Sequence, residues 1–332
     1  MPSGVLITSH CARPNRKPSS GLEPRREIMK QEVCVLGAGR MGSSIVRTLL
    51  NNGYSTSVWN RTAAKCAHLI ALGAKSGRSV EEVVGQSDVI FVNVLDYAAS
   101  DAVLKGDGVA ALLSGKIIVQ LTSGSPRLAR EEAAWAEAQG AEYLDGAIMA
   151  TPDFIGRPEA ALLYSGSKSA FETSEPVLLT LGGQTRYVGD APGQASALDI
   201  ALLTQMWGGL FGALQGLAVA QAEGIDIETF HNQFLAFKPV VDAALLDLID
   251  RTRSGRFAGD EKTLASIGAH HSAFQHLLEF CEEQGLDATL PHTMDGFFHR
   301  ALAQNGASAD FASLAPLFRR DVIHPDMEKA DA

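Results

Sequence analysis

The chain has 332 residues, of which 46% are hydrophobic and 20% are charged, and its formal net charge is −10. This length accommodates two domains with a large core, and the composition is ordinary for a soluble globular enzyme. The negative balance argues against nucleic acid and anionic membrane surfaces as partners. The four cysteines lie far apart, without a Cys-x-x-Cys pair. This usage favours free thiols in a reducing compartment, the cytoplasm, over a disulfide framework or a zinc site.

The sequence pattern predicts three parts. Residues 1–29 carry four prolines and scattered basic residues without a signal-peptide core, so we expect a disordered leader. Residues 30–191 alternate apolar strand segments with helical segments, which predicts an α/β domain of the doubly wound Rossmann type, with a mostly parallel sheet. Residues 192–332 show helical patterns only, so we predict an all-α domain that begins with a long interdomain helix.

The expected elements follow from hydrophobic periodicity. The predicted strands are 32–36, 55–59, 88–94, 116–121, 143–146, 160–164 and 185–188. The predicted helices are 40–52, 62–72, 79–85, 98–103, 126–139, 169–180, 194–223, 226–251, 260–284, 291–304 and 308–319.

A glycine-rich turn, Gly37-x-Gly39-x-x-Gly42, connects the first predicted strand to an amphipathic helix that opens with Arg40 and Met41. Glycines at this spacing let a backbone turn tightly and approach a pyrophosphate, and the N–H groups of the helix start then face the phosphates. The position between a strand and a helix makes a dinucleotide site the favoured interpretation over a simple turn.

The end of the second predicted strand indicates which dinucleotide is bound. An NAD site usually carries an acid here, which accepts hydrogen bonds from the ribose 2′-OH. This chain has Asn60, Arg61, Thr62 and Lys65 instead. A carboxylate would repel a 2′-phosphate, whereas a guanidinium and a hydroxyl would hold it. The sequence therefore predicts NADP(H) as the cofactor.

Residues 200–222 contain no charged side chain and are long enough to span a bilayer. Polar side chains such as Thr204 and Gln205 interrupt the segment, and Asp199 precedes it. A helix buried between domains or in a dimer has the same composition, and we favour that interpretation over a membrane span.

Three further segments carry a resemblance to a known family: residues 121–126, 143–152 and 193–199. Together with the glycine turn, they closely resemble the imine reductases and reductive aminases, which reduce C=N bonds with NADPH. The resemblance runs from about residue 31 to about residue 320. It implies an imine, amine or ketone as the small-molecule substrate. It also implies an interlocked, domain-swapped homodimer whose active sites use both chains.

The related β-hydroxyacid dehydrogenases share this layout but carry lysine and asparagine where this chain has Asp199 and Leu203. Lysine suits an alcohol or carbonyl, since its proton moves to and from oxygen. A carboxylate suits an iminium because it stabilises the positive nitrogen. Imine reduction is therefore the favoured function. A β-hydroxyacid dehydrogenase-like oxidoreductase and a non-catalytic NADP(H)-binding dimer remain the alternatives.

Three residues are candidates for catalysis. Asp199 is expected to anchor or protonate the imine nitrogen; the alternative is a carboxylate that complements the helix dipole. Asn93, after the fourth predicted strand, would hold a carbinolamine or the nicotinamide ribose, or else bond its own loop. Trp207, where many relatives have tyrosine, cannot act as an acid and would form an aromatic wall, or else pack in the core.

The remaining candidate positions lie in strand-end loops and in the helical domain. The further cofactor-binding candidates are Val94, Leu95, Thr122 and Ser123. The candidate substrate-pocket residues are Met149, Ala150, Thr151, Pro152, Trp207 and His270, the last contributed by the partner subunit in relatives. His270, His271 and His276 are not spaced i, i+4, so no metal site is expected.

Overall fold

The computed structural model describes residues 30–319, and the predicted leader lies outside the described residues. The chain divides into two compact units, with the boundary between Leu202 and Leu203, inside helix α8 (Gln194–Ala222). The predicted domain boundary after residue 191 precedes this helix and stays a prediction.

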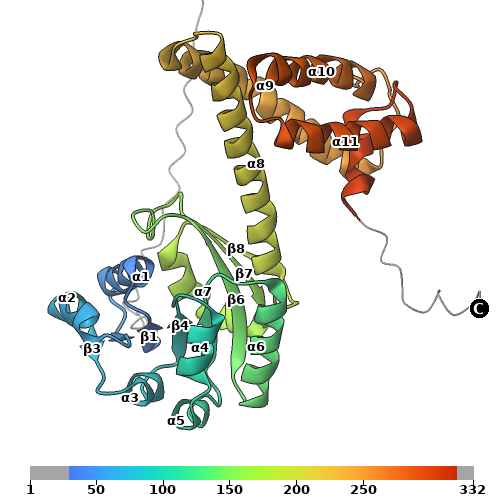
Figure 1. Cartoon of the computed structure of the whole chain (residues 1–332). Coiled ribbons are helices and arrows are strands. Elements are labelled where there is room, and N and C mark those ends of the chain that lie inside the picture. The colour runs from blue at the N-terminus through green and yellow to red at the C-terminus, as the bar shows by residue number, and fades with distance from the viewer. Residues whose placement is uncertain (1–29, 320–332) are drawn as a thin grey trace, which may run out of the picture. The chain divides into compact units, whose positions relative to one another are not determined.

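An eight-stranded sheet forms the centre of the first unit (Figure 1). Its strands are β1 Val33–Leu36, β2 Thr56–Trp59, β3 Lys75–Ser76, β4 Val89–Val92, β5 Ile117–Gln120, β6 Glu142–Met149, β7 Ala161–Gly166 and β8 Gln184–Gly189. They are arranged in the order β3-β2-β1-β4-β5-β6-β7-β8, and every neighbouring pair is parallel except β6 and β7. The predicted mostly parallel sheet is confirmed. Strand β3 was not predicted because its two exposed residues carry no apolar pattern.

Helices cover both faces of this sheet. They are α1 Arg40–Asn51, the 3-10 turn η1 Ala63–Cys66, α2 Ala67–Ala71, α3 Val80–Gly85, α4 Tyr97–Leu104, α5 Asp107–Ala110, α6 Pro126–Ala138 and α7 Lys168–Leu181. In β1, Val33 and Val35 pack in one core with side chains of α1 and α7, whereas Cys34 and Leu36 pack in a second core with α3, α4 and α6. Burial on both faces explains why β1 is continuously apolar.

Polar side chains with short reach mark the starts of several helices. Each accepts a hydrogen bond from a backbone N–H of the first turn, which would otherwise have no partner within the helix. The cap residues of α3, α4, α6 and α7 are Ser79, Asp96, Ser125 and Ser167.

The second unit contains α9 (Ile227–Ser254), α10 (Ile267–Gln284), α11 (Thr289–Asn305) and the 3-10 segment η2 (Phe311–Phe318). The predicted all-helical character is confirmed, but two predicted helices are wrong in detail. The helix expected over 260–284 begins only at Ile267, after the cap residue Ser266. The helix expected over 308–319 is a 3-10 segment that contains Pro316, which has no N–H for a helical bond.

A buried arginine explains the late start of α10. Arg251 has no exposed surface, and its guanidinium pairs with Asp247 at 3.0 Å, Asp260 at 2.9 Å and Asp310 at 3.2 Å. The bonds from Arg251 hold the pKa of Asp260 at about 2. Because Asp260 must reach this arginine, the segment after α9 stays a loop and ties the end of α9 to the start of η2.

Helix α8 is the one helix among residues 30–319 that is long and apolar enough to cross a membrane by length and composition. None of its most apolar window is buried in the single chain. The burial that the sequence predicts for this helix is therefore not supplied by the chain alone.

Candidate functional site

The three glycines of the turn after β1 have different structural roles. Gly37 has a φ of +115°, and a Cβ there would lie 2.0 Å from the backbone oxygen of Asn93. A Cβ on Gly42 would lie 2.0 Å from the carbonyl oxygen of Gly37. A Cβ on Gly39 would meet no atom within 4 Å. The outer glycines are thus required by the protein itself, whereas the middle one leaves space that a bound pyrophosphate can approach.

The turn opens onto a cationic cavity. Helix α1 begins at Arg40, with no capping side chain and no acidic residue in its first turn. A cavity of about 610 Å³ lies beside this helix start; it is lined by Ala38, Gly39, Arg40, Ser43, Ser44, Arg47, Lys65, His68, Pro152 and Asp153. Basic side chains beside a helix N-terminus form a site for an anion, so the residues present fit a dinucleotide phosphate.

Two basic lining residues of this cavity were missed by the sequence reasoning. Arg47 lies two turns after Arg40 on α1, and this i, i+7 spacing was a readable signal. His68 lies in α2 and reaches the cavity through the packing of α2 beside α1, which the sequence does not show.

Of the candidate cofactor residues after β2, Asn60 makes hydrogen bonds within the protein, whereas the others are exposed. The Oδ1 atom of Asn60 accepts a hydrogen bond from the N–H of Ala38 at 3.1 Å, and its Nδ2 donates to the carbonyl oxygen of Thr62 at 3.0 Å. Asn60 therefore joins this loop to the glycine turn. Arg61, Thr62 and Lys65 are exposed, and of these only Lys65 lines the cavity.

Hydrogen bonds join the loops that follow β4 and β5. The Nδ2 of Asn93 donates to the carbonyl oxygen of Leu121 at 2.9 Å, and the N–H of Val94 donates to Oγ1 of Thr122 at 3.1 Å. The side chain of Asn93 therefore bonds the neighbouring loop after β5 rather than its own loop, and its contact with a reaction intermediate or the nicotinamide ribose stays a prediction. Leu95 and Ser123 are exposed beside these bonds.

The buried carboxyl of Glu132 is hydrogen-bonded to residues next to the same loops. Oε1 of Gln120 accepts a hydrogen bond from the N–H of Thr122 at 2.9 Å, and Nε2 of Gln120 donates to Glu132 at 2.6 Å. Ser100 and Tyr143 also donate to Glu132. Burial raises the pKa of Glu132 despite these bonds. The network fixes Thr122 at the carboxyl edge of the sheet, and no sequence motif indicated it.

The first turn of α8 is anchored to strand β6 by Asp145. This carboxylate is buried and accepts hydrogen bonds from the N–H of Ser196 at 3.0 Å, from its Oγ at 2.7 Å and from Oγ of Ser165 at 3.2 Å. Ser165 in turn accepts from the N–H of Ala195 at 2.9 Å. Together these bonds satisfy the orphan donors at the start of the helix.

Asp199 follows three residues after Ser196 on the same helix and is half-buried. Burial raises the pKa of its carboxyl, and the negative charge of Asp145 raises it further. Within residues 30–319 no hydrogen bond to this carboxylate is found. The arrangement is typical of a carboxyl that serves a ligand rather than the fold.

The predicted pocket residues are spread over both units. Met149 and Ala150 are half-buried at the end of β6, and Pro152 lines the cationic cavity. Thr151 is exposed and donates to Asp153 at 2.7 Å. Trp207 is 49% exposed on the part of α8 that belongs to the second unit.

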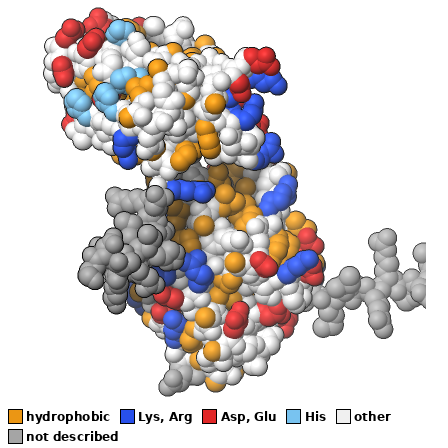
Figure 2. Space-filling view, turned by 90° about the vertical axis from the view of Figure 1, so that its right-hand side faces the viewer, with side chains coloured by type: hydrophobic (Ala, Val, Ile, Leu, Met, Phe, Trp, Pro, Cys, Tyr) orange, Lys and Arg blue, Asp and Glu red, His pale blue; other side chains and the backbone are white. Residues whose placement is uncertain are grey.

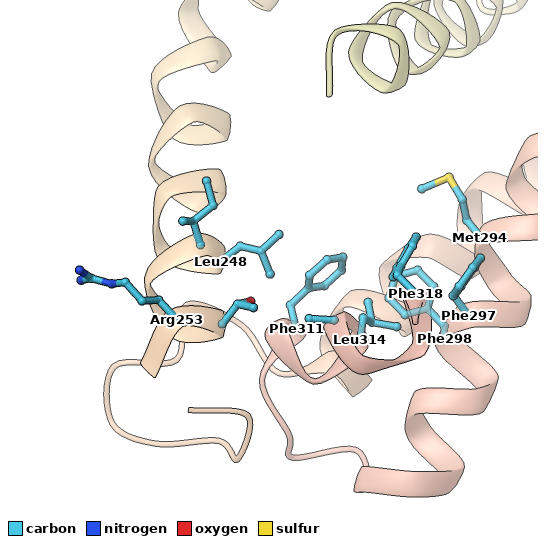
Figure 3. Close-up of a pocket in the computed structure, with 11 residues that line it drawn as sticks. Leu248, Arg253, Met294, Phe297, Phe298, Phe311, Leu314 and Phe318 are labelled. Carbon is cyan, nitrogen blue, oxygen red and sulfur yellow. The ribbon is translucent and has the colours of Figure 1, made fainter. Parts of the chain in front are cut away.

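The second unit contains two apolar cavities of its own. His270 lines the larger one, about 1030 Å³, and its ring lies edge-on to Phe311 with the centroids 4.9 Å apart. The smaller one, about 680 Å³, is shown in Figure 3, where Leu248 from α9 and the ring of Phe311 face the cluster around Phe318. The helical unit therefore offers apolar space, and His270 is a polar group at its edge.

Comparison with known families divides the chain into two parts that meet just before α8. Residues 32–189 match the NAD binding domain of 6-phosphogluconate dehydrogenase. Residues 191–320 match the C-terminal domain of NADPH-dependent reductive aminase-like proteins.

Individual relatives span nearly the whole chain. An NADPH-dependent reductive aminase from Aspergillus oryzae is 32% identical over 292 residues, which are 88% of this chain and 98% of the relative. The structure of an imine reductase from Myxococcus stipitatus in complex with NADP+ is 49% identical, with a TM-score of 0.83 over 87% of this chain and all of that one. A reductive aminase from Aspergillus terreus in complex with NADPH4, cyclohexanone and allyl amine is 32% identical, with a TM-score of 0.77 over 87% and 99%.

Because Lys65 lines the cationic cavity, we predict that it favours NADPH over NADH. Replacing Lys65 with alanine should raise the KM for NADPH by about tenfold and change the KM for NADH little, because a charge-assisted bond to the 2′-phosphate is lost. Steady-state kinetics with both cofactors measure this. Lys75→Ala, an exposed lysine that pairs with Glu32, is the matched control. Equal weakening of both cofactors would contradict a role at the 2′-phosphate.

The anchor of α8 predicts an electrostatic coupling. Asp145→Asn keeps a side chain that accepts from Ser196, since the serine hydroxyls can reorient to accept from the new amide. Without the like charge, the pKa of Asp199 should fall toward its ordinary value. NMR titration of carbon-13-labelled aspartate, assigned with Asp199→Asn, measures this pKa. Glu175→Gln, exposed on α7, is the control. An unchanged pKa in Asp145→Asn would show that the two carboxylates do not interact.

Proposed function

Because this chain belongs to the family of NADPH-dependent imine reductases and reductive aminases, we propose that Asp199 is the residue that anchors or protonates the imine nitrogen. The chain is an NADPH-dependent oxidoreductase that acts on C=N bonds. The observation that carries the proposal is the half-buried Asp199 carboxyl, fixed by the anchored start of α8 and engaged by no donor among the described residues.

Chemically, the reaction needs a hydride at the imine carbon and a proton at nitrogen. NADPH supplies the hydride when it is bound. The glycine turn and the basic cavity beside α1 hold the phosphates of the cofactor. In its ionised form, Asp199 stabilises the iminium cation; in its protonated form, it gives nitrogen the proton. The raised pKa of Asp199 increases the fraction of the protonated form at a given pH.

We extend the proposal to substrate precursors. The Aspergillus terreus relative is described with a ketone, cyclohexanone, and an amine, allyl amine. We propose that this chain likewise accepts ketone and amine. The candidate substrate contacts are Met149, Ala150 and Trp207, together with His270, which the family resemblance assigns to the partner subunit. Asn93 would then orient the substrate or the nicotinamide ribose from the carboxyl edge of the sheet.

The N-terminal match alone fits a hydroxyacid dehydrogenase as well, because the dinucleotide-binding domain is shared. The C-terminal match and Asp199 in place of the dehydrogenases' lysine favour the imine. The non-catalytic alternative gives no reason for a half-buried carboxyl that has no hydrogen-bond donor among the described residues, and Asp199 is such a carboxyl.

We further propose that the enzyme is a homodimer. Large apolar side chains lie exposed along α8 and α9; Leu210, Phe211, Leu214 and Phe237 are each 56% to 62% exposed. Hydrophobic side chains are visible on the surface of the molecule in Figure 2. Exposed apolar area of this extent marks an interaction surface, and a second copy that interlocks its helical unit would cover it.

The apolar helix α8 fits this picture better than a membrane span. The matched C-terminal family domain covers residues 191–320 and so contains the whole helix, which supports α8 as part of an enzyme domain rather than a membrane span. We place the enzyme in the cytoplasm because Cys34, Cys66 and Cys281 are free thiols, as expected in a reducing compartment.

The role of Asp199 is tested with two substrates that differ only in the need for a proton. With a neutral cyclic imine, Asp199→Asn should lower kcat/KM by about 10²-fold or more. With the N-methylated, permanently charged iminium, the loss should be smaller, since no proton is transferred. NADPH consumption measures both rates.

Asp190→Asn, an exposed carboxylate just before α8, is the control and should behave like the wild type. Equal losses on both substrates would assign Asp199 a purely electrostatic role. Unchanged rates in Asp199→Asn would show that another group donates the proton. If the wild type turned over no imine, the dehydrogenase and non-catalytic alternatives would be favoured instead.

The dimer is tested at the apolar face of α8. Leu214→Lys should shift sedimentation from twice the chain mass to a single chain and remove most activity, because a charge is placed in a buried apolar interface. Leu72→Lys, a leucine of similar exposure in the first unit, should leave the dimer intact. A wild-type dilution series that yields an active monomer would refute the proposal.

A further inference from the structure

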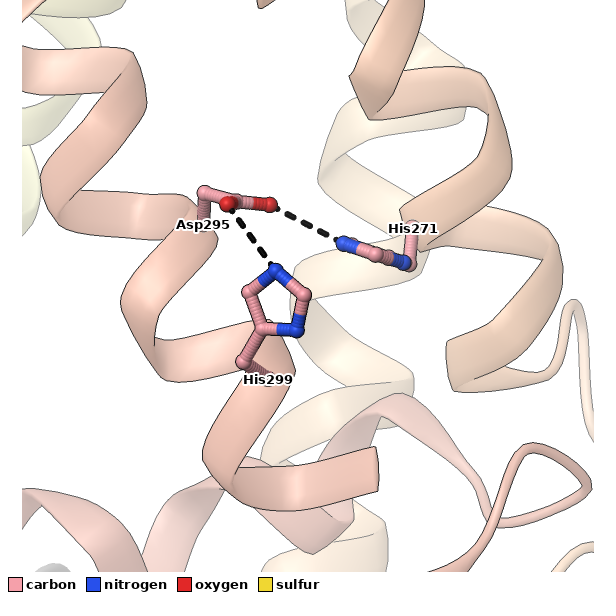
Figure 4. A group of neighbouring side chains, drawn as sticks. All are labelled: His271, Asp295 and His299. Carbon is pink, nitrogen blue, oxygen red and sulfur yellow. Dashed lines mark hydrogen bonds and ion pairs between the residues drawn. The ribbon is translucent and has the colours of Figure 1, made fainter. Parts of the chain in front are cut away.

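Two helices of the second unit bring together side chains that commonly bind metal ions. Figure 4 shows His271 on α10 and Asp295 and His299 on α11, with their polar ends directed at one another. Nε2 of His271 lies 2.9 Å from Oδ1 of Asp295, and Nε2 of His299 lies 3.2 Å from Oδ2. Each of the three residues offers one potential ligand atom, and these three atoms lie within 4.8 Å of one another.

The helical spacing makes this a paired arrangement. Asp295 and His299 are four residues apart on α11, so they lie on one face of that helix. His271 and Gln275 are four residues apart on α10, and Nε2 of Gln275 lies 2.7 Å from Oδ1 of Asp295 and 2.9 Å from Nε2 of His271. Two successive turns of each helix therefore direct four polar side chains toward one point.

The surroundings hold the cluster in place and leave it accessible. The side chains of His271 and Asp295 are only 17% and 16% exposed, whereas that of His299 is 65% exposed. The ring of His271 packs against Phe298, with the centroids 5.6 Å apart. An ion could enter from solvent on the side of His299 and meet ligands that are already packed.

Charge also favours a cation at this point. The carboxylate of Asp295 lies against both imidazoles and accepts a hydrogen bond from Nε2 of Gln275 at 2.7 Å. The three residues then present one negative charge and two imidazole nitrogens, which coordinate a metal in their neutral form.

We propose that His271, Asp295 and His299 bind a divalent transition metal ion, with zinc the best fit, and that water completes the coordination. Two imidazole nitrogens and a carboxylate oxygen are a common zinc donor set, whereas magnesium and calcium prefer oxygen ligands alone. Zinc–ligand bonds of about 2.0–2.2 Å place neighbouring ligand atoms roughly 3–3.5 Å apart in a tetrahedron. The pair at 3.2 Å has this spacing and the pair at 2.9 Å is slightly closer. Because the two histidines approach different oxygens of Asp295, the imidazole rings would rotate when one ion binds all three residues.

The ion would join α10 to α11 and would take no part in the reduction. Its binding would stabilise the folded helical unit, because an ion that binds only the folded state shifts the folding equilibrium. The proposal is independent of the function of Asp199, since it rests on a different cluster within the second unit.

The test uses the full-length chain without an affinity tag and with metal removed by chelation. Calorimetric titration with Zn²⁺ should show one saturable site per chain, and Zn²⁺ should raise the thermal midpoint in a way that EDTA reverses. Substitution with Co²⁺ should give the visible absorption bands of a tetrahedral site.

His271→Ala and His299→Ala should each weaken Zn²⁺ binding by about tenfold or more and remove the thermal shift. His276→Ala, on the same helix but paired with Glu279 outside the cluster, should retain both. Far-ultraviolet circular dichroism of the variants confirms that their helices form. Unchanged Zn²⁺ affinity in the double variant His271→Ala/His299→Ala, or no saturable binding by the wild type, would show that the cluster is only a hydrogen-bonded contact between two helices.

Discussion

The bonds that Asp145 makes with the start of α8 are the constraint on which the proposed chemistry depends. A buried carboxylate is costly unless donors surround it, and the backbone and hydroxyl of Ser196 and the hydroxyl of Ser165 supply them. The same bonds fix the helix that carries Asp199 to strands β6 and β7 of the sheet. A second carboxyl then sits near the first, and this proximity adds to the effect of burial on the pKa of Asp199. One buried charge thus has both a structural and an electrostatic consequence.

The two units differ in how completely they bury their own apolar surface. The first unit has a core on each face of its sheet, and the four residues of β1 are fully buried. The second unit has a small core around Ile267 and Phe298 and is tied by the charged cluster at Arg251, while the apolar sides of α8 and α9 stay exposed. The proposed second copy would supply the burial that this apolar surface lacks in the single chain.

Local sequence failed where a distant residue decided the conformation. The start of α10 depends on the pairing of Asp260 with Arg251, and helical periodicity over 260–284 contains no sign of it. The sequence also does not show that the side chains of Asn60 and Asn93 bond Ala38 and Leu121, while their contacts with ligands stay predictions. Similarly, the spacing of His270, His271 and His276 argued against a metal site, while the partners of His271 lie about 25 residues further along the chain.

The sequence by itself determined the doubly wound sheet, the helical second part, the dinucleotide turn and the family, because these follow from periodicity, glycine spacing and short motifs. Tertiary structure alone decided how side chains distant in sequence meet: Asp145 with Ser196, Glu132 with Gln120, and His271 with Asp295. The physical reason is range. Propensity and periodicity act within a few residues, whereas hydrogen bonds and charges depend on distances in space that only the packed chain sets.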